Sequence, residues 1–441
     1  MAERIVEHMM VRIRFFTLKQ ILSMVLGLTT VLHAETVKKL EIDFKRNPDF
    51  LPYVIEKVRY NDWSVQSRPI WQSVQVYRRG HPGSENEMFI EAFNKELNAD
   101  APSSFIYYDA QEEKIISQVN VYYTITDYRV LLDKDGKGRG IIAGCYRNDS
   151  AFVFRHYLAT GQRDFIYLTS GIDQTGDGEW VPGISLWAMT DYDYDDKTEV
   201  FFYVNPSFDM EPRILFCIES ESLHIEWSIP LACHMVAPPL SCKDSLNPSV
   251  ILVTYGPQNG VKDENFDDRF GYIVKVDNHG KILFRKIVSK DFRGPAIIRK
   301  AGSDSLFYLY HPLPFIDPDS TDNLPEDAQL LSIIDQDCNI LQSVPVGEEL
   351  NQLWLCDYTG DNSLELYTKS TTGVIRIYDD RLRLLAESNR TNFGRFADTI
   401  RLAGQDNPAF VLSTPAKSTD IYSYDMQKLT SYGETFTRYQ P

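Results

Sequence analysis

A hairpin pattern recurs seven times along this 441-residue chain, at intervals of about 45 to 60 residues. In each copy, an apolar, β-branched or aromatic run ends in an acidic or polar turn, and a second such run follows. The copies are FIYYDAQEEKIISQ from Phe105, FVFRHYLATGQRDFIYL from Phe152, ILFCIESESLHIEWS from Ile214, YIVKVDNHGKILFRK from Tyr272, LLSIIDQDCNILQS from Leu330, VIRIYDDRLRLLAES from Val374 and IYSYDMQKLTSYGE from Ile421. One supersecondary unit is therefore used repeatedly, which excludes most single-core folds.

Another apolar run precedes each hairpin, as in TEVFFYV near Val200 and PSVILVTY near Ile251, and a further strand often lies upstream. Four short antiparallel strands at this period are typical of a β-propeller blade. Helical solenoids fit badly, because runs of four to eight apolar residues dominate and a 3.6-residue period is scarce. We predict an all-β, seven-bladed β-propeller, with six blades as the alternative if the copy near Met88 is a different structure.

The N-terminus has the features of a signal peptide. Basic residues including Arg12 and Lys19 precede the short apolar stretch 21–32, and Ala34 ends a small-residue cleavage site. We expect residues 1–34 to be removed on export to the periplasm, the medium or the cell surface; an uncleaved membrane anchor is the alternative. Residues 35–72 are predicted to be a lead-in segment or cap, residues 73–441 to form the propeller, and no later segment to cross a membrane.

The chain carries a formal charge of −17, and loss of residues 1–34 makes it −19. A protein this acidic is repelled by phosphate backbones and anionic lipids, so nucleic acid and bare membranes are poor partners. Much of the acid lies in Asp-rich turns, which favours cations instead.

The most specific chemical motif is DYDYDDKTEV, with Asp191, Asp193, Asp195 and Glu199 at positions 1, 3, 5 and 9. This spacing brings several hard oxygen ligands to one point, as a calcium ion with six to eight oxygen ligands requires. The alternative is that Asp and Asn simply form good turns. An EF-hand is excluded, because strands flank the motif and no Glu stands at position 12.

Other turns repeat the pattern less completely. DYTGDNSLEL supplies Asp357, Thr359, Asp361 and Glu365 at the same spacing. Weaker candidates are Asp133 and Asp135 in DKDGKGRG, and Asp173 and Asp177 in DQTGDGEW, for which plain turn formation is favoured.

With four-stranded repeats and acidic turns, the chain resembles the FG-GAP or VCBS-type repeat family, the integrin-α-like propellers. The resemblance implies that the acidic loop joins the first and second strands of a blade and holds structural calcium. Asp191, Asp193, Asp195, Glu199, Asp357, Asp361 and Glu365 match that motif. The Phe-Gly and Gly-Ala-Pro signatures of the family are absent, so the match is specific in only two blades.

The six cysteines form no CxxC pair, which disfavours a zinc cluster or a thioredoxin-like site. In an oxidising compartment Cys233 could pair with Cys242, and Cys338 with Cys356. Cys145 and Cys217 are expected to be core residues.

No GxSxG, HExxH, P-loop or GxGxxG motif marks an enzyme. A glycosidase or a quinoprotein-like dehydrogenase remains the catalytic alternative, although only Trp227 stands where such a dehydrogenase would carry a docking Trp. Long loops after Val204, Tyr255 and Tyr310 favour recognition instead. Trp180, Phe208, Phe266 and Phe315 are expected to be exposed there and to suit a glycan or a peptide. We predict a monomeric ligand-binding or sensory module without catalysis, and an adhesion or scaffold module as the alternative.

Overall fold

The computed structural model describes 23 stretches of the chain. They are residues 41–43, 55–59, 64–67, 71–78, 87–94, 103–109, 114–121, 123–132, 138–174, 176, 180–206, 211–242, 246–290, 292, 294–303, 305–320, 325–356, 358, 363–388, 395–401, 408–413, 419–423 and 428–432. The predicted signal peptide lies outside the described residues. Within them, no helix is long and apolar enough to span a membrane.

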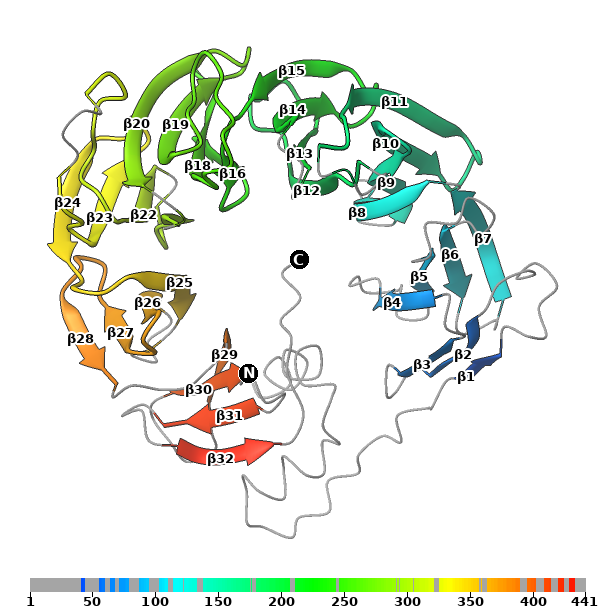
Figure 1. Cartoon of the computed structure of the whole chain (residues 1–441). Helices are drawn as coiled ribbons and strands as arrows, with labels where there is room; N and C mark the ends of the chain where they lie inside the picture. Colours follow the sequence, from blue (N-terminus) through cyan, green and yellow to red (C-terminus); the bar gives the residue numbers. More distant parts are fainter. Residues whose placement is uncertain are drawn as a thin grey trace, which may run out of the picture. The chain divides into compact units, whose positions relative to one another are not determined.

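The described elements are all β-strands, and neighbouring strands within each sheet are antiparallel (Figure 1). A three-stranded sheet comes first, with β1 (Glu41–Asp43), β2 (Ile55–Arg59) and β3 (Ser64–Ser67). It lies within the predicted lead-in segment, whose role in closing a ring stays a prediction.

Two four-stranded sheets follow. The first has β4 (Trp71–Arg78), β5 (Glu87–Asn94), β6 (Ser103–Asp109) and β7 (Lys114–Val121). The second has β8 (Thr124–Leu132), β9 (Gly138–Arg147), β10 (Ser150–Tyr157) and β11 (Arg163–Ser170).

The next two sheets occupy the middle of the chain. One has β12 (Gly183–Thr190), β13 (Glu199–Asn205), β14 (Ile214–Glu219) and β15 (Ile225–Pro230). The other has five strands, β16 (His234–Met235), β17 (Leu240–Cys242), β18 (Ser249–Tyr255), β19 (Phe270–Asp277) and β20 (Ile282–Lys290), with both β16 and β17 pairing with β18.

Three further four-stranded sheets complete the described chain. They consist of β21 (Ala296–Arg299), β22 (Leu306–His311), β23 (Leu330–Asp335) and β24 (Ile340–Pro345); β25 (Leu350–Cys356), β26 (Glu365–Ser370), β27 (Ile375–Tyr378) and β28 (Leu384–Glu387); and β29 (Arg395–Arg401), β30 (Pro408–Ser413), β31 (Thr419–Tyr422) and β32 (Lys428–Tyr432).

A succession of four-stranded antiparallel meanders is the blade architecture of a β-propeller, so the predicted fold class is confirmed. The closure of a ring and its number of blades stay predictions. By its contacts the chain divides into two compact units, Met1–Leu186 with Phe202–Pro212, and Trp187–Phe201 with Arg213–Pro441.

The second strands of these sheets are the most deeply buried. Strands β13 and β18 are buried at six of seven positions and β26 at all six, because neighbouring strands cover both edges and packed side chains cover both faces. The fourth strands are the outermost in each sheet, and β24 and β28 have mostly exposed residues. The buried second strands therefore provide a rigid base for the turns at their ends.

The hairpin between the third and fourth strands has a repeated turn. The Asp277 carboxylate accepts hydrogen bonds from the backbone N–H groups two and four residues later, at 2.9 Å each, and Asp335 and Asp379 do the same at 2.8 to 2.9 Å. The residue three positions after each Asp has a positive φ: 80° for Gly280, 61° for Cys338 and 53° for Leu382. The acidic turn of the sequence repeat is thus an Asp-capped turn with one left-handed residue.

Candidate metal centre

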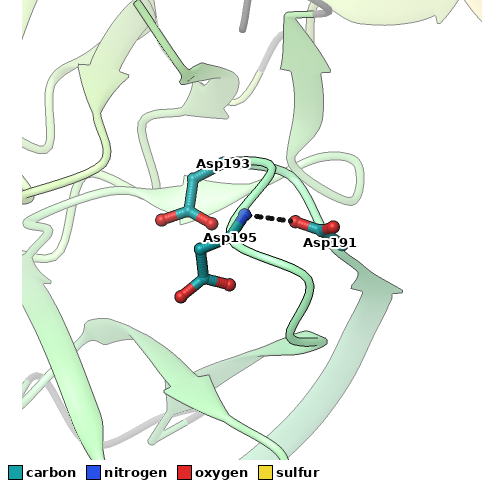
Figure 2. A group of neighbouring side chains, drawn as sticks. All are labelled: Asp191, Asp193 and Asp195. Carbon is teal, nitrogen blue, oxygen red and sulfur yellow. Dashed lines mark hydrogen bonds between the residues drawn. The ribbon is translucent and has the colours of Figure 1, made fainter.

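The Asp191 turn joins β12 to β13, the first and second strands of their sheet. Asp191, Asp193 and Asp195 each place one carboxylate oxygen within 4.8 Å of those of the other two (Figure 2). The sequence prediction that these three acids converge is therefore correct. Three hard oxygens at this separation can share one cation, and without a cation their charges repel.

Local hydrogen bonds set the shape of this turn. The backbone N–H of Asp195 donates to Asp191 Oδ1 at 3.2 Å, as Figure 2 shows, and that of Lys197 donates to Asp195 Oδ1 at 2.9 Å. Tyr194 and Asp196 have φ values of 64° and 67°, in the left-handed region that few non-glycine residues adopt. The alternating backbone turns successive Asp side chains toward one another.

Glu199 is the fourth acid of the motif and the first residue of β13. Its side chain is fully buried, and Oε2 accepts a hydrogen bond of 3.2 Å from the backbone N–H of Tyr192. The other oxygen, Oε1, is buried and makes no hydrogen bond with a described residue, as is true of Asp193 Oδ1. Burial first, and then the carboxylates of Asp193, Glu226 and Asp195, raise the pKa of Glu199 to about 8, although the hydrogen bond from the N–H of Tyr192 lowers it.

These observations agree with a divalent cation at the turn. A buried carboxylate oxygen without a partner is costly, and a metal ion would supply the missing interaction. Burial, and then the neighbouring Asp195, also raise the pKa of Asp193. The donor set is carboxylate oxygen alone, which suits calcium better than zinc or copper.

Behind the turn lies a buried network on β14 and β15. Trp227 Nε1 donates to Tyr192 Oη at 2.8 Å, and the Tyr192 and Phe201 ring centroids are 5.4 Å apart. Cys217 Sγ lies 3.5 Å from Glu226 Oε2. Trp227, which the sequence suggested as a possible docking residue of a quinoprotein, is buried and supports the turn instead.

The Asp357 turn occupies the equivalent place between β25 and β26. Asp357, Thr359 and Asp361 lie outside the described residues. Glu365 is buried, and its Oε2 accepts a hydrogen bond of 2.6 Å from the backbone N–H of Tyr358. Glu199 makes the same contact with Tyr192. Unlike Glu199 Oε1, Glu365 Oε1 accepts a hydrogen bond of 2.7 Å from the Ser363 hydroxyl. The sequence motif thus has a second feature, a Tyr at position 2 whose backbone contacts the Glu at position 9.

The weaker candidates differ from these two turns. Asp133, Asp135 and Asp177 lie outside the described residues. Asp173 lies between β11 and β12, so it is in a connection between sheets and not in a turn between a first and a second strand. Asp173 Oδ1 accepts a hydrogen bond of 2.7 Å from the backbone N–H of Gly176, whose φ is 76°. This contact agrees with the turn-forming interpretation of Asp173.

The structure corrects the expectation that aromatic residues of the loops are exposed. Trp180 is 2% exposed and Phe266 is 1% exposed, while Phe315 is half-buried against Phe284 and His311. Phe208 lies outside the described residues. In loops as long as these, large rings gain more free energy from packing against the sheet than from display to solvent.

The two cysteine pairs that the sequence left possible are not formed in this structure. None of the six cysteines is in a disulfide, all six are buried, and Cys145 and Cys217 are core residues as predicted. Cys242 lies in one hydrophobic cluster with Cys338, whereas neither Cys233 nor Cys356 belongs to that cluster.

Comparisons with known proteins give no family. No protein-family model matches the chain, and no curated protein matches it. Solved structures resemble it only distantly. The Dos1 propeller is 11% identical with a TM-score of 0.41, over 84% of this chain and 80% of its own. Sqt1 of Saccharomyces cerevisiae is 11% identical with a TM-score of 0.41, over 74% and 78%.

A third structure, BBS1N in complex with ARL6DN, is 10% identical with a TM-score of 0.40, over 80% of this chain and 97% of that chain. A quinohemoprotein alcohol dehydrogenase from Pseudomonas putida is 11% identical with a TM-score of 0.40, over 75% and 61%. A protein in complex with a partner and an enzyme thus both occur among the similar structures.

Proposed function

We propose that this chain is an exported β-propeller that binds calcium at the Asp191 turn and recognises a protein or glycan partner without catalysis. The observation that carries the calcium proposal is the convergence of Asp191, Asp193 and Asp195 within 4.8 Å. The unpartnered, buried Oε1 of Glu199 is independent support. Calcium at this turn would be structural, because a bound cation offsets the repulsion among carboxylates that the strands hold together.

Recognition is assigned to the connections between second and third strands. In an antiparallel meander these connections lie at the opposite end of the sheet from the turn between the first and second strands, so the calcium and the partner would occupy opposite ends. Hydrogen bonds hold the β18–β19 connection in place. The buried Asp268 carboxylate accepts one hydrogen bond of 2.8 Å from the backbone N–H of Asn259 and another of 2.9 Å from that of Val261.

The β22–β23 connection is braced in a similar way. The backbone N–H groups of Leu313 and Ile316 donate to the carbonyls of Val288 and Ile287 at 2.9 and 3.0 Å, and Lys286 lies 2.8 Å from Asp317. Loops that are ordered before binding lose less conformational entropy when a partner binds. The hydrogen bonds and the ion pair that order these two connections therefore favour a role in binding over the alternative that they are merely tolerated insertions.

Thermal unfolding of the full chain with calcium and with a chelator tests the metal proposal. Calcium at one hundred times its dissociation constant should stabilise the folded state by about 2.7 kcal/mol. Asp193→Asn should remove the shift, whereas Asp196→Asn, at an exposed acid outside the cluster, should retain it. Equal shifts in both variants, or no shift in the unmodified protein, would overturn calcium binding at this turn.

Terbium luminescence gives a second readout of the same site. Tyr194 is 45% exposed and stands between Asp193 and Asp195, so its ring should sensitise a bound Tb³⁺ ion. The emission should fall with added calcium and with Tyr194→Phe. Emission that survives Asp193→Asn would place the metal elsewhere.

Export is tested by the N-terminus of the protein recovered from the producing cells. Cleavage predicts a chain that begins at Glu35 outside the cytoplasm. A full-length chain that stays in the membrane fraction would favour the uncleaved anchor. Partner classes can then be compared on glycan arrays and on immobilised extracellular protein, with the calcium-loaded chain as probe.

A further inference from the structure

We infer that Cys242 and Cys338 form a redox-active thiol pair that can close into a disulfide between two successive sheets. Cys242 is the last residue of β17, and Cys338 lies in the turn between β23 and β24. The pair is 96 residues apart in sequence, and both residues belong to the same half of the chain by contacts. This inference does not depend on calcium binding.

Both side chains point into the core that these two sheets share. Cys242 is 1% exposed and Cys338 is 2% exposed. Ile251 and Ile273 enter this cluster from the first of the two sheets, and Phe307 and Ile334 from the second. The two thiols therefore lie in the same core between the packed sheets, and not at a free surface.

Direct contacts hold the Cys338 turn against β17 and β19. Cys242 Sγ lies 3.6 Å from the carbonyl oxygen of Gln336, two residues before Cys338. Lys275 Nζ makes an ion pair of 2.6 Å with Asp337, the residue immediately before Cys338. Three consecutive turn residues thus face the neighbouring sheet, and Cys242 is among the groups that they meet.

The conformation of Cys338 directs its side chain inward. It has a φ of 61° in the Asp335-capped turn, at the position that Gly280 occupies in the equivalent turn of the preceding sheet. A non-glycine residue there is strained.

The cations beside the pair favour reaction at Cys242. Burial raises the pKa of the Cys242 thiol; a hydrogen bond with Ser249, and then Lys275 and Arg299, lower it, while Asp337 raises it slightly. The pKa of Cys338 is raised by burial first and then by Cys242, and Lys275 lowers it. Cys242 is therefore the better attacking thiolate.

The oxidant is a small disulfide such as oxidised glutathione. During refolding, before the two sheets pack together, the Cys242 thiolate attacks one sulfur of glutathione disulfide, and the first glutathione leaves as a thiolate that takes up the proton lost by Cys242. The Cys338 thiolate then attacks Cys242 Sγ and releases the second glutathione. Two protein thiols are oxidised and one glutathione disulfide is reduced to two thiols.

Peptide mapping after equilibration with oxidised glutathione tests the pair, both in the native full chain and after refolding in the same buffer. Digestion with trypsin and a Glu-specific protease places Cys338 in the peptide 327–348, away from Cys356, and Cys242 in the peptide 227–243. The expected result is a reducible cross-link between these peptides and a fall from six to four free thiols. Because peptide 227–243 also holds Cys233, the cross-link must survive Cys233→Ser.

Variants separate the proposed pair from general thiol oxidation. Cys242→Ser should abolish the cross-link and the rise in Tm that oxidation produces, and Cys145→Ser, at another buried cysteine, should leave both unchanged. If Cys242→Ser does not fold, Cys338→Gly provides the same test, because Gly280 shows that this turn accepts glycine. Six free thiols under both oxidising conditions, or a cross-link of Cys338 to Cys356, would overturn the inference.

Discussion

Glu199 accepts a hydrogen bond of 3.2 Å from the backbone N–H of Tyr192, seven residues before it. The same contact joins Tyr358 to Glu365 at 2.6 Å in another sheet. In both turns the Tyr and the Glu are buried. The hydrogen bond from the Tyr N–H to the ninth-position acid, called the clamp below, therefore holds the two ends of the turn together. In the first turn, the second carboxylate oxygen of Glu199 makes no hydrogen bond with a described residue and could bind a cation.

Two substitutions of Glu199 should separate its hydrogen bond with Tyr192, the clamp, from its proposed role in binding calcium. Glu199→Gln keeps an acceptor for the Tyr192 N–H, so stability in chelator should be unchanged or higher, while the calcium-induced gain is lost. Glu199→Ala also removes the clamp and should cost about 1–3 kcal/mol in chelator. Denaturant unfolding with and without calcium measures both effects. Equal losses in chelator for the Gln and Ala variants would contradict the clamp.

The Tyr192–Trp227 hydrogen bond should be a main support of the same turn. Tyr192→Phe leaves the buried indole N–H of Trp227 without its 2.8 Å acceptor and should cost about 1–3 kcal/mol. A double-mutant cycle with Trp227→Phe should give a coupling of about 1 kcal/mol. Tyr194→Phe, at an exposed ring, is the control and should be close to neutral in chelator. Additive effects of the two buried substitutions would show that the bond contributes nothing.

His311 should make the fold sensitive to acid. Its Nδ1 lies 2.6 Å from the Leu313 carbonyl oxygen and its Nε2 lies 2.7 Å from Ser332 Oγ, and burial lowers its pKa to about 4. An unfolded histidine has a pKa of about 6.5. Because the folded state binds its proton less tightly, this stability is present above about pH 6.5 and is lost as the pH falls toward 4.

For this one group the loss between pH 7.5 and pH 5 should be about 2 kcal/mol. His311→Gln should reduce the pH dependence of the unfolding free energy by that amount, although it lowers stability at pH 7.5. His279→Gln, at an exposed histidine, should leave the slope unchanged. An unaltered slope in His311→Gln would mean that His311 does not titrate between these pH values.

Much of the fold could be predicted because the relevant interactions are local. The VDNHGK, IDQDCN and YDDRLR segments each contain the Asp that caps the turn and the residue that adopts a positive φ, so a hairpin can be recognised from six contiguous residues. The convergence of Asp191, Asp193 and Asp195 was predictable for the same reason, since it depends on the backbone of one short turn.

The errors concern residues whose surroundings come from elsewhere in the chain. Trp180 and Phe266 stand among polar residues in sequence, but the sheet beneath each loop buries them. Sequence proximity suggested Cys233 for Cys242 and Cys356 for Cys338, and packing of one sheet on the next brought Cys242 and Cys338 together instead.

The sequence by itself determined the all-β repeat, the Asp-capped hairpins and the place of the acidic turn between a first and a second strand. Period-two patterning and turn chemistry act over a few bonds, so contiguous residues are enough to specify them. Only the tertiary structure decided that Glu199 Oε1 is buried without a hydrogen bond to a described residue and that Cys242 contacts Gln336, 94 residues away. Burial and contact between sheets depend on how distant strands pack, and no stretch of contiguous residues contains that information.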